Sequence, residues 1–222
     1  MWIDSGYDLC NRIRRVYNSR IMWRHWRAGG HTWFDHRLDE FDWPERIFWV
    51  ERGVLGRFHL PPGAKVLDLC CGDGYFSDCF WSPSAGHIDA IDRDPEALAL
   101  ARARHTKANI DYRCLDVVRD ELPCSDYDLV CFFEAIEHFS IEDGLGVLEK
   151  IKDALVPGGW LVGSSTAVAS ANRGKGNVEH DNEFADAQSL AAFVGRVFAE
   201  PSVFSSHHPA RTTLYFAVQK PA

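Results

Sequence analysis

Residues 66–74 read VLDLCCGDG, a short apolar run that ends in cysteines and glycines. Branched and large apolar residues favour a buried β-strand, and glycines at its end allow a tight turn in which the backbone approaches a ligand. A helix is expected directly after the turn, and the N-terminus of a helix attracts carboxylate or phosphate groups. This segment therefore predicts a strand, a ligand-binding turn and a helix.

The rest of the chain alternates between strand-like and helix-like segments. Helices are expected at Pro95–Arg104 and Ile141–Leu155, and this alternation predicts a doubly wound, mostly parallel sheet with helices on both faces. The last two strands are joined by residues 208–211, too few for a crossover helix, so the final strand should run antiparallel. The predicted fold is α/β and Rossmann-like with seven strands, at Lys65–Leu69, His87–Ile91, Ile110–Leu115, Asp128–Phe133, Trp160–Ser164, Ser202–His207 and Thr212–Gln219.

Acidic residues follow two further strands of this predicted sheet. Asp92 ends the second strand, eighteen residues after Gly74, where a carboxylate can accept both hydroxyl protons of a ribose. Asp116 ends the third strand, where an acid can bind an adenine amino group. Each signal is weak alone, but a glycine turn and two acids at the carboxyl ends of neighbouring strands together predict a nucleoside site.

Composition sets the class of protein and one internal boundary. The 222 residues carry a net charge of −8, with 46% hydrophobic and 25% charged residues, which is typical of a globular protein and excludes collagen-like, disordered and disulfide-stapled classes. We place a boundary at Pro61-Pro62-Gly63. Residues 1–62 carry net charge +2 and six of the eight tryptophans, and residues 63–222 carry −10.

The segment 1–62 is predicted to form a helical lid. Its first helix places Leu9, Ile13, Val16, Tyr17 and Ile21 at helical spacing, and a second is expected from Pro44, with its apolar stripe at Ile47, Val50, Val54 and Phe58. The aromatic side chains of this segment either line a ligand pocket or pack the helices onto the core. They are Trp23, Trp26, Trp33 and Phe34. The arginine-rich run Asn11–Arg27 suits a solvated helix or nucleic acid.

Several patterns bear on location and partners. The seven cysteines include no CxxC pair, so we expect no zinc knuckle but buried, reduced thiols in a cytoplasmic protein. The opening Met1-Trp2-Ile3-Asp4 has no signal-peptide pattern, and Pro157-Gly158-Gly159 interrupts the longest uncharged stretch, so no membrane association is expected. The acidic balance makes nucleic acid an improbable partner without excluding it. A monomer or homodimer is expected.

The segments VLDLCCGDGYFS, IDAIDRDPEAL, LDVVRDELPCSDYDLV and KIKDALVPGGWLVGSS together resemble the class I S-adenosylmethionine-dependent methyltransferases, over residues 63–220. The resemblance implies an enzyme that uses S-adenosylmethionine. It assigns the methionine end of the cofactor to Asp68, Cys70, Gly72 and Gly74, the ribose to Asp92 and Arg93, the adenine to Asp116 and Val117, and the cofactor amino group to the carbonyl of Phe133.

One position departs from the family pattern, and two alternatives stay open. Cys70 stands where the family has its first loop glycine, which puts cofactor affinity in question. Asp68 and Asp116 have a plainer interpretation as residues that cap turns. A nicotinamide-binding Rossmann domain would need Gly or Ala at position 77, where this chain has Ser77.

Acidic and histidine residues follow the fourth predicted strand in the stretch Glu134-Ala135-Ile136-Glu137-His138. In a helical turn, positions i, i+3 and i+4 share one face, so Glu134, Glu137 and His138 are expected to converge. Two carboxylates and an imidazole suit a divalent ion that lowers a hydroxyl pKa. His180 lies in a later polar segment.

This stretch resembles two groups of methyltransferases, those that act on the 2′-oxygen of small RNAs and those of ubiquinone biosynthesis. The resemblance implies a divalent metal such as Mg²⁺ on Glu134, Glu137, His138 and His180. A metal-free alternative makes His138, Glu137 and His180 catalytic as base or orienting groups, and a structural role is a third possibility.

The predicted function is O-methylation of a small-molecule hydroxyl by S-adenosylmethionine. Acceptor specificity is expected from residues 1–62 and the loop Ala167–Asn182. The alternatives are a 2′-O-methyltransferase of RNA ends, an N- or C-methyltransferase of a small metabolite, and a non-catalytic protein of this fold.

Overall fold

A computed structural model of the protein describes residues 5–6, 8–10, 12–13, 47–169, 180–209 and 211–222. The chain forms two units, residues 1–47 and 48–222. In the first unit, the described residues between 5 and 13 are helical. The other residues of the expected lid before position 47, which include the predicted helix start at Pro44, and most of the loop Ala167–Asn182 lie outside the described residues.

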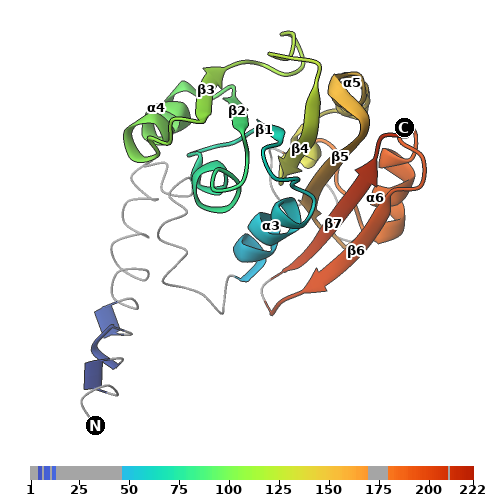
Figure 1. The fold of residues 1–222 in the computed structure, drawn as a ribbon. Helices are drawn as coiled ribbons and strands as arrows, with labels where there is room; N and C mark the ends of the chain where they lie inside the picture. Colours follow the sequence, from blue (N-terminus) through green and yellow to red (C-terminus); the bar gives the residue numbers. More distant parts are fainter. Residues whose placement is uncertain (1–4, 7, 11, 14–46, 170–179, 210) are drawn as a thin grey trace. The chain divides into compact units, whose positions relative to one another are not determined.

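The second unit contains the predicted seven-stranded sheet, in the order β3-β2-β1-β4-β5-β7-β6 (Figure 1). Strands β1 to β5 are parallel, and β7 runs antiparallel to both β5 and β6. The strands are β1 (Lys65–Leu69), β2 (His87–Asp92), β3 (Ile110–Cys114), β4 (Tyr127–Phe133), β5 (Leu155–Thr166), β6 (Ser202–His207) and β7 (Thr212–Gln219).

Strand β5 is longer than the sequence indicated. It starts at Leu155, and its pairing with β4 shifts register between Tyr127 and Leu129. Gly158 has φ +78° and donates its N–H to the carbonyl of Lys220 at 2.9 Å. The proline and glycines that indicated a turn therefore form an irregularity within a continuous strand.

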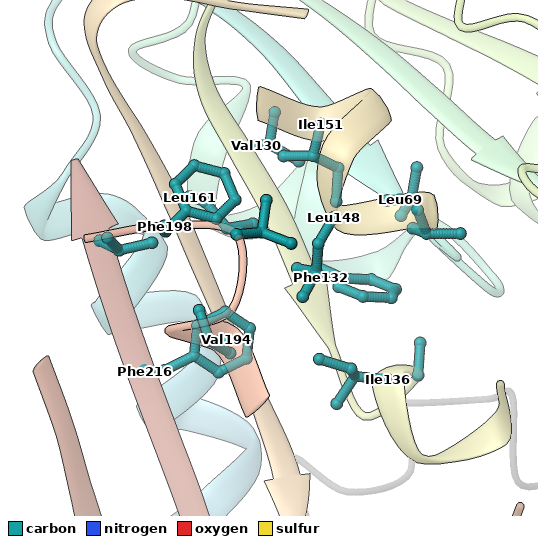
Figure 2. Close-up of a cluster of buried hydrophobic side chains, with 14 of the residues drawn as sticks. Leu69, Val130, Phe132, Ile136, Leu148, Ile151, Leu161, Val194, Phe198 and Phe216 are labelled. Atoms are coloured by element: carbon teal, nitrogen blue, oxygen red, sulfur yellow. The ribbon is translucent and has the colours of Figure 1, made fainter. Parts of the chain in front are cut away.

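Two apolar layers cover the sheet. One side holds Val66, Ile88 and Leu129 against Trp81 of η4 (Ser77–Trp81) and Leu98 of α4 (Pro95–Arg104). On the other side, α5 (Ile141–Ala154) packs against β5, and α6 (Ala187–Val194) packs against β6 and β7. Figure 2 shows this second layer, in which side chains from both helices meet Phe132, Leu161 and Phe216. The expected helices on both faces are confirmed.

Helix termini explain where α4, α5 and α6 begin. Asp94 caps α4 by accepting the N–H groups of Glu96 and Ala97, and Pro95 occupies the first turn. Ser140 accepts the N–H of Asp143 at the start of α5. At α6, Asp186 and Ser189 form a reciprocal capping box. The predicted bounds of α4 and α5 are confirmed to within one residue.

The predicted apolar stripe of the helix before β1 is wrong. Helix α3 (Ile47–Phe58) leaves Val54 39% and Phe58 83% exposed. Its buried face instead contains Phe48, Arg52, Gly53 and Gly56. A Cβ atom on Gly56 would lie 2.4 Å from Nε1 of the buried Trp81, so glycine is needed for this close approach, and apolar periodicity cannot detect such a face.

Two further expectations concern cysteines and membranes. All seven cysteines are free, as expected, but only Cys71 and Cys131 are buried, and Cys10, Cys79 and Cys114 are exposed. Among the described residues, no helix is both long enough and apolar enough to cross a membrane.

Candidate active site

The predicted cofactor residues lie near the point between β1 and β4 where the order of the strands in the sheet reverses. Strands β2 and β3 lie on one side of β1, and β4 and β5 lie on the other. At such a switch point the loops that leave the strands diverge and open a crevice at the carboxyl ends. Asp68 lies in β1 and Cys70 directly follows it, Asp92 ends β2, Asp116 follows β3 and Phe133 ends β4.

The turn after β1 has three residues with positive φ, Cys70 (60°), Gly72 (55°) and Gly74 (74°). Glycine adopts this conformation without strain, whereas a side chain such as that of Cys70 is strained there. The chain therefore keeps the backbone of a glycine-rich loop although the glycine at position 70 is replaced. A Cβ on Gly74 would lie 2.6 Å from the Tyr112 hydroxyl oxygen, so β3 also restricts this turn.

Asp92 has a role that the sequence did not reveal. Its Oδ2 accepts the N–H of Gly72 at 2.8 Å, and its Oδ1 accepts the N–H of Asp94 at 2.9 Å. The carboxylate thus holds the glycine turn against the end of β2. Burial raises the pKa of Asp92, while hydrogen bonds from Asp94 and Gly72 oppose that shift. Exposed Arg93 follows directly.

Asp68 is buried and accepts a hydrogen bond from the Ser77 hydroxyl at 2.6 Å. Burial raises the pKa of Asp68 to about 7. The pair ties the end of β1 to η4. This contact favours the plainer interpretation of Asp68 as a residue that fixes the turn.

The turn after β3 is folded around Asp116. Its Oδ1 accepts the N–H of Val118 at 3.0 Å, and its Oδ2 lies 3.6 Å from Nε of Arg119. Its own N–H donates to Oδ2 of Asp120 at 2.9 Å. Asp116 therefore does cap a turn, and buried Val117 lies beside it.

Glu134 is held by two arginines. Arg211, in the turn between β6 and β7, donates from Nη2 to Oε2 of Glu134, and Nη2 of Arg52 lies 3.3 Å from the same oxygen. The hydroxyls of Ser164 and Thr166 on β5 donate to the two carboxylate oxygens at 2.9 and 3.0 Å. Burial alone would raise the pKa of Glu134, but Arg52 and Arg211 lower it well below its usual range.

Sequence reasoning missed Arg52 and Arg211. Arg52 is 5% exposed, and its guanidinium carbon lies 4.0 Å from the centre of the Trp49 ring, a cation–π contact that helps an arginine tolerate burial. Both arginines are far from Glu134 in sequence, so no local spacing indicates the pairing.

The expected convergence of Glu134 with Glu137 and His138 is not observed. Glu134 has φ +47° and lies before the short helix η5 (Ile136–His138), so the three residues do not share a helical face. Glu137, His138 and His180 do come together, with one potential ligand atom from each within 4.8 Å of the others. The centres of the imidazole rings of His138 and His180 are 4.9 Å apart, and the rings meet edge to face.

The backbone explains how the distant His180 reaches this group. The carbonyl of Glu137 accepts the N–H groups of Asp181 and Asn182, at 2.9 and 3.0 Å. The Glu137 side chain is buried, and its Oε2 has no hydrogen-bond partner among the described residues. Burial raises the pKa of Glu137 to about 8, and the negative charge of Glu134 contributes to the shift.

Comparisons with known proteins identify the family. The family described as "Methyltransferase domain" matches residues 66–159. An uncharacterised methyltransferase of Mycobacterium bovis is 30% identical over 138 residues, which cover 54% of this chain and 68% of that protein. The chain belongs to the class I S-adenosylmethionine-dependent methyltransferases. The predicted family and fold are confirmed.

Two other similarities are informative within limits. A ubiquinone biosynthesis O-methyltransferase of Idiomarina loihiensis is 29% identical over 147 residues, or 64% of this chain and 56% of the relative. This chain therefore spans little more than half of that protein. The N-methyltransferase NodS of Bradyrhizobium japonicum, solved with S-adenosyl-L-homocysteine, has a TM-score of 0.64 at 18% identity, covering 81% of this chain and 90% of NodS. That likeness concerns the fold alone.

The residues at the switch point fit S-adenosylmethionine. The turn at 70–74 keeps three positive φ angles, so its backbone can approach a ligand, and a Cβ at Gly74 would collide with Tyr112. Carboxylates follow β2 and β3, where a ribose and an adenine amino group need acceptors. The methyltransferase therefore keeps the backbone shape and the acceptor groups that this cofactor requires.

The strained turn gives a first prediction. Cys70→Gly should be more stable than Cys70→Ala by about 1 kcal/mol, because both remove the thiol and only alanine keeps a Cβ at φ +60°. At Cys114, exposed in β3, the order should reverse, because glycine weakens a strand. Denaturant unfolding of the four variants measures both differences. An alanine variant more stable than the glycine variant at both positions would contradict a left-handed Cys70.

The buried carboxyl of Glu137 gives a second prediction. Between pH 5 and 8 the unfolded chain loses this proton and the folded chain keeps it, so stability falls with rising pH. Glu137→Gln removes this loss, and its stability relative to wild type should rise by up to roughly 1.4 kcal/mol per pH unit across that window. Urea unfolding in EDTA, with the exposed Glu149→Gln as control, measures it. A pH-independent difference would mean that Glu137 is ionised in the folded protein.

Proposed function

We propose that this methyltransferase transfers a methyl group from S-adenosylmethionine to a hydroxyl oxygen of a small molecule. The observation that carries the proposal is the group formed by Glu137, His138 and His180. Two of its members, Glu137 and His138, lie in η5, shortly after the carboxyl end of β4. The named function of the ubiquinone-biosynthesis relatives, O-methylation, points the same way.

The chemistry asks little of the protein beyond alignment and one proton transfer. The bound cofactor supplies an electrophilic methyl group on a sulfonium. The turn at 70–74 and the acids Asp92 and Asp116 would hold it, and the carbonyl of Phe133 would accept a hydrogen bond from its amino group. The chain's own catalytic task is to orient the acceptor and to remove its hydroxyl proton, and a well-placed base contributes about 10²–10⁴ to the rate.

We assign removal of the acceptor's hydroxyl proton to His138, with Glu137 and His180 as residues that orient its imidazole. The two imidazole rings are in contact, at 4.9 Å, and a neutral imidazole is a competent base near neutral pH. Glu137 keeps its own proton over much of this range and then acts as a hydrogen-bond donor. Oxygen is favoured over nitrogen because a hydroxyl needs this help more than an amine does.

The same three side chains are the part of the predicted metal set that comes together. A glutamate and two histidines suit a divalent transition metal, but an ion would have to displace the proton of Glu137. Glu134 is engaged by Arg52 and Arg211, whose positive charges oppose a cation there. We therefore place the metal-free base first. The free cysteines suit the reducing cytoplasm that we also propose.

Cofactor binding is the first test. Calorimetry should show S-adenosylmethionine binding to the wild type, and Asp92→Ala should weaken it at least tenfold, or about 1.4 kcal/mol, because the ribose loses its acceptor and the turn loses its anchor. Asp126→Ala, which removes an exposed carboxylate just before β4, should leave affinity unchanged. Failure of the wild type to bind S-adenosylmethionine would refute the proposed enzymatic activity.

Turnover tests the assignment of His138. With the best acceptor from a panel of phenols and catechols, His138→Ala should lower kcat about 10²–10⁴-fold and leave S-adenosylmethionine affinity within twofold. Formation of S-adenosyl-L-homocysteine is the measurement. Normal turnover would return His138 to a packing role. Wild-type turnover should withstand EDTA, and a loss that Mg²⁺ or Mn²⁺ restores would make the three residues a metal site.

A further inference from the structure

Lys150 on α5 reaches across to the turn that follows β3. Its Nζ donates to the carbonyl oxygens of Val117, Val118 and Asp120, at 2.9, 3.0 and 2.9 Å. An ammonium group has three N–H donors, so all of them are used on the backbone of one short turn. Neither spacing in the sequence nor any assigned role of the site indicates this contact.

The turn needs an external partner because of how β3 connects to β4. Residues 115–126 cross from one edge of the sheet to its centre without forming a helix, whereas such crossovers usually contain one. Inside the turn, the N–H groups of Val118, Arg119 and Asp120 all donate to Asp116. Lys150 supplies hydrogen-bond donors for three carbonyl groups of this turn.

These contacts form a chain from α5 to the adenine side of the proposed cofactor site. Lys150 fixes the carbonyl side of the turn, and the amide side of the same turn fixes Asp116 and its carboxylate. The N–H of Leu115 donates to the carbonyl of Asp92 at 3.0 Å, which fixes the start of the turn. The orientation of Asp116 therefore depends on Lys150 at one end and on β2 at the other.

We propose that Lys150 is a positioning residue for adenine recognition, acting through the turn 116–120. This inference rests on the proposed function, because it requires that the site bind S-adenosylmethionine. In this proposal Lys150 acts on the cofactor only through the turn. Its ammonium holds the three carbonyls together, and without it the turn relaxes and Asp116 no longer presents its carboxylate to the adenine amino group.

A simple brace for α5 would have the same contacts but different consequences. The helix is already packed through buried Val147, Leu148 and Ile151, so it does not depend on Lys150 for attachment. The chain offers a matched control in Lys152 on the same helix, whose Nζ donates to the carbonyl of Val197 at 2.8 Å, away from the turn. Loss of Lys152 removes a similar contact and leaves Asp116 untouched.

The site is open to small molecules from outside. A surface hollow of about 380 Å³ adjoins Lys150, lined also by Glu121, Leu122, Pro123, Cys124, Ser125, Asp153 and Ala154. A small alkylammonium ion can therefore enter when the side chain is truncated and can supply the missing donors. This accessibility makes chemical rescue a direct test of the hydrogen-bonding role.

The experiment is calorimetry on the full chain with two nucleosides, 5′-methylthioadenosine and 5′-methylthioinosine, which differ in the adenine amino group. The wild type should prefer the adenosine compound. Lys150→Met keeps most of the apolar stem and removes the donors, and it should bind S-adenosylmethionine about tenfold more weakly and lose most of that preference. Lys152→Ala should retain both.

Rescue separates positioning from general damage. In Lys150→Ala, n-butylammonium chloride should restore affinity, and tetramethylammonium chloride at equal concentration should not, because it has no N–H donor. Unchanged affinity and preference in Lys150→Met would overturn the proposal, as would an equal loss in Lys152→Ala. Failure of the wild type to bind S-adenosylmethionine would refute the proposed function instead.

Discussion

The half-buried carboxylate of Glu134 connects helix α3, strand β5 and the turn between β6 and β7. It joins Arg52 of α3, two hydroxyls of β5 and Arg211 from the turn between β6 and β7. Burying these charges is tolerable only because they are paired, and removing one partner of such a pair typically costs about 3–5 kcal/mol. The positive φ of Glu134 is a strain that this network holds in place.

This network also determines the chemistry beside it. Because Glu134 is ionised and held by two guanidinium groups, it lies apart from the cluster of Glu137, His138 and His180. Its negative charge adds to the effect of burial on Glu137 and helps to keep that carboxyl protonated. Two glutamates three positions apart therefore have opposite protonation states near neutral pH. Only Glu137 belongs to the group with His138 and His180 that we propose acts on the methyl acceptor.

The cofactor side follows a different principle, in which turns without regular structure are held by single polar side chains. Asp92 holds the turn after β1, and Lys150 holds the turn after β3. Since the connection from β3 to β4 has no helix, its shape depends on these contacts more than on packing. Members of the family have the same sheet. We therefore expect them to differ in the side chains that hold these turns as well as in the residues that contact the substrate.

Local patterns in the sequence determined the strands, the caps of α4 and the glycine turn, because alternation, capping residues and positive φ act within a few residues. They also located Asp92 at the end of a strand and Glu137 and His138 shortly after one. Only the tertiary structure decided the buried face of α3, the arginine partners of Glu134, the approach of His180 and the contact of Lys150 with the turn 116–120. The contacts of Lys150 with this turn join residues 30 to 33 positions apart, and that of Arg52 with Glu134 joins residues 82 positions apart. Charge pairing and burial across such distances leave no periodic signal in the chain.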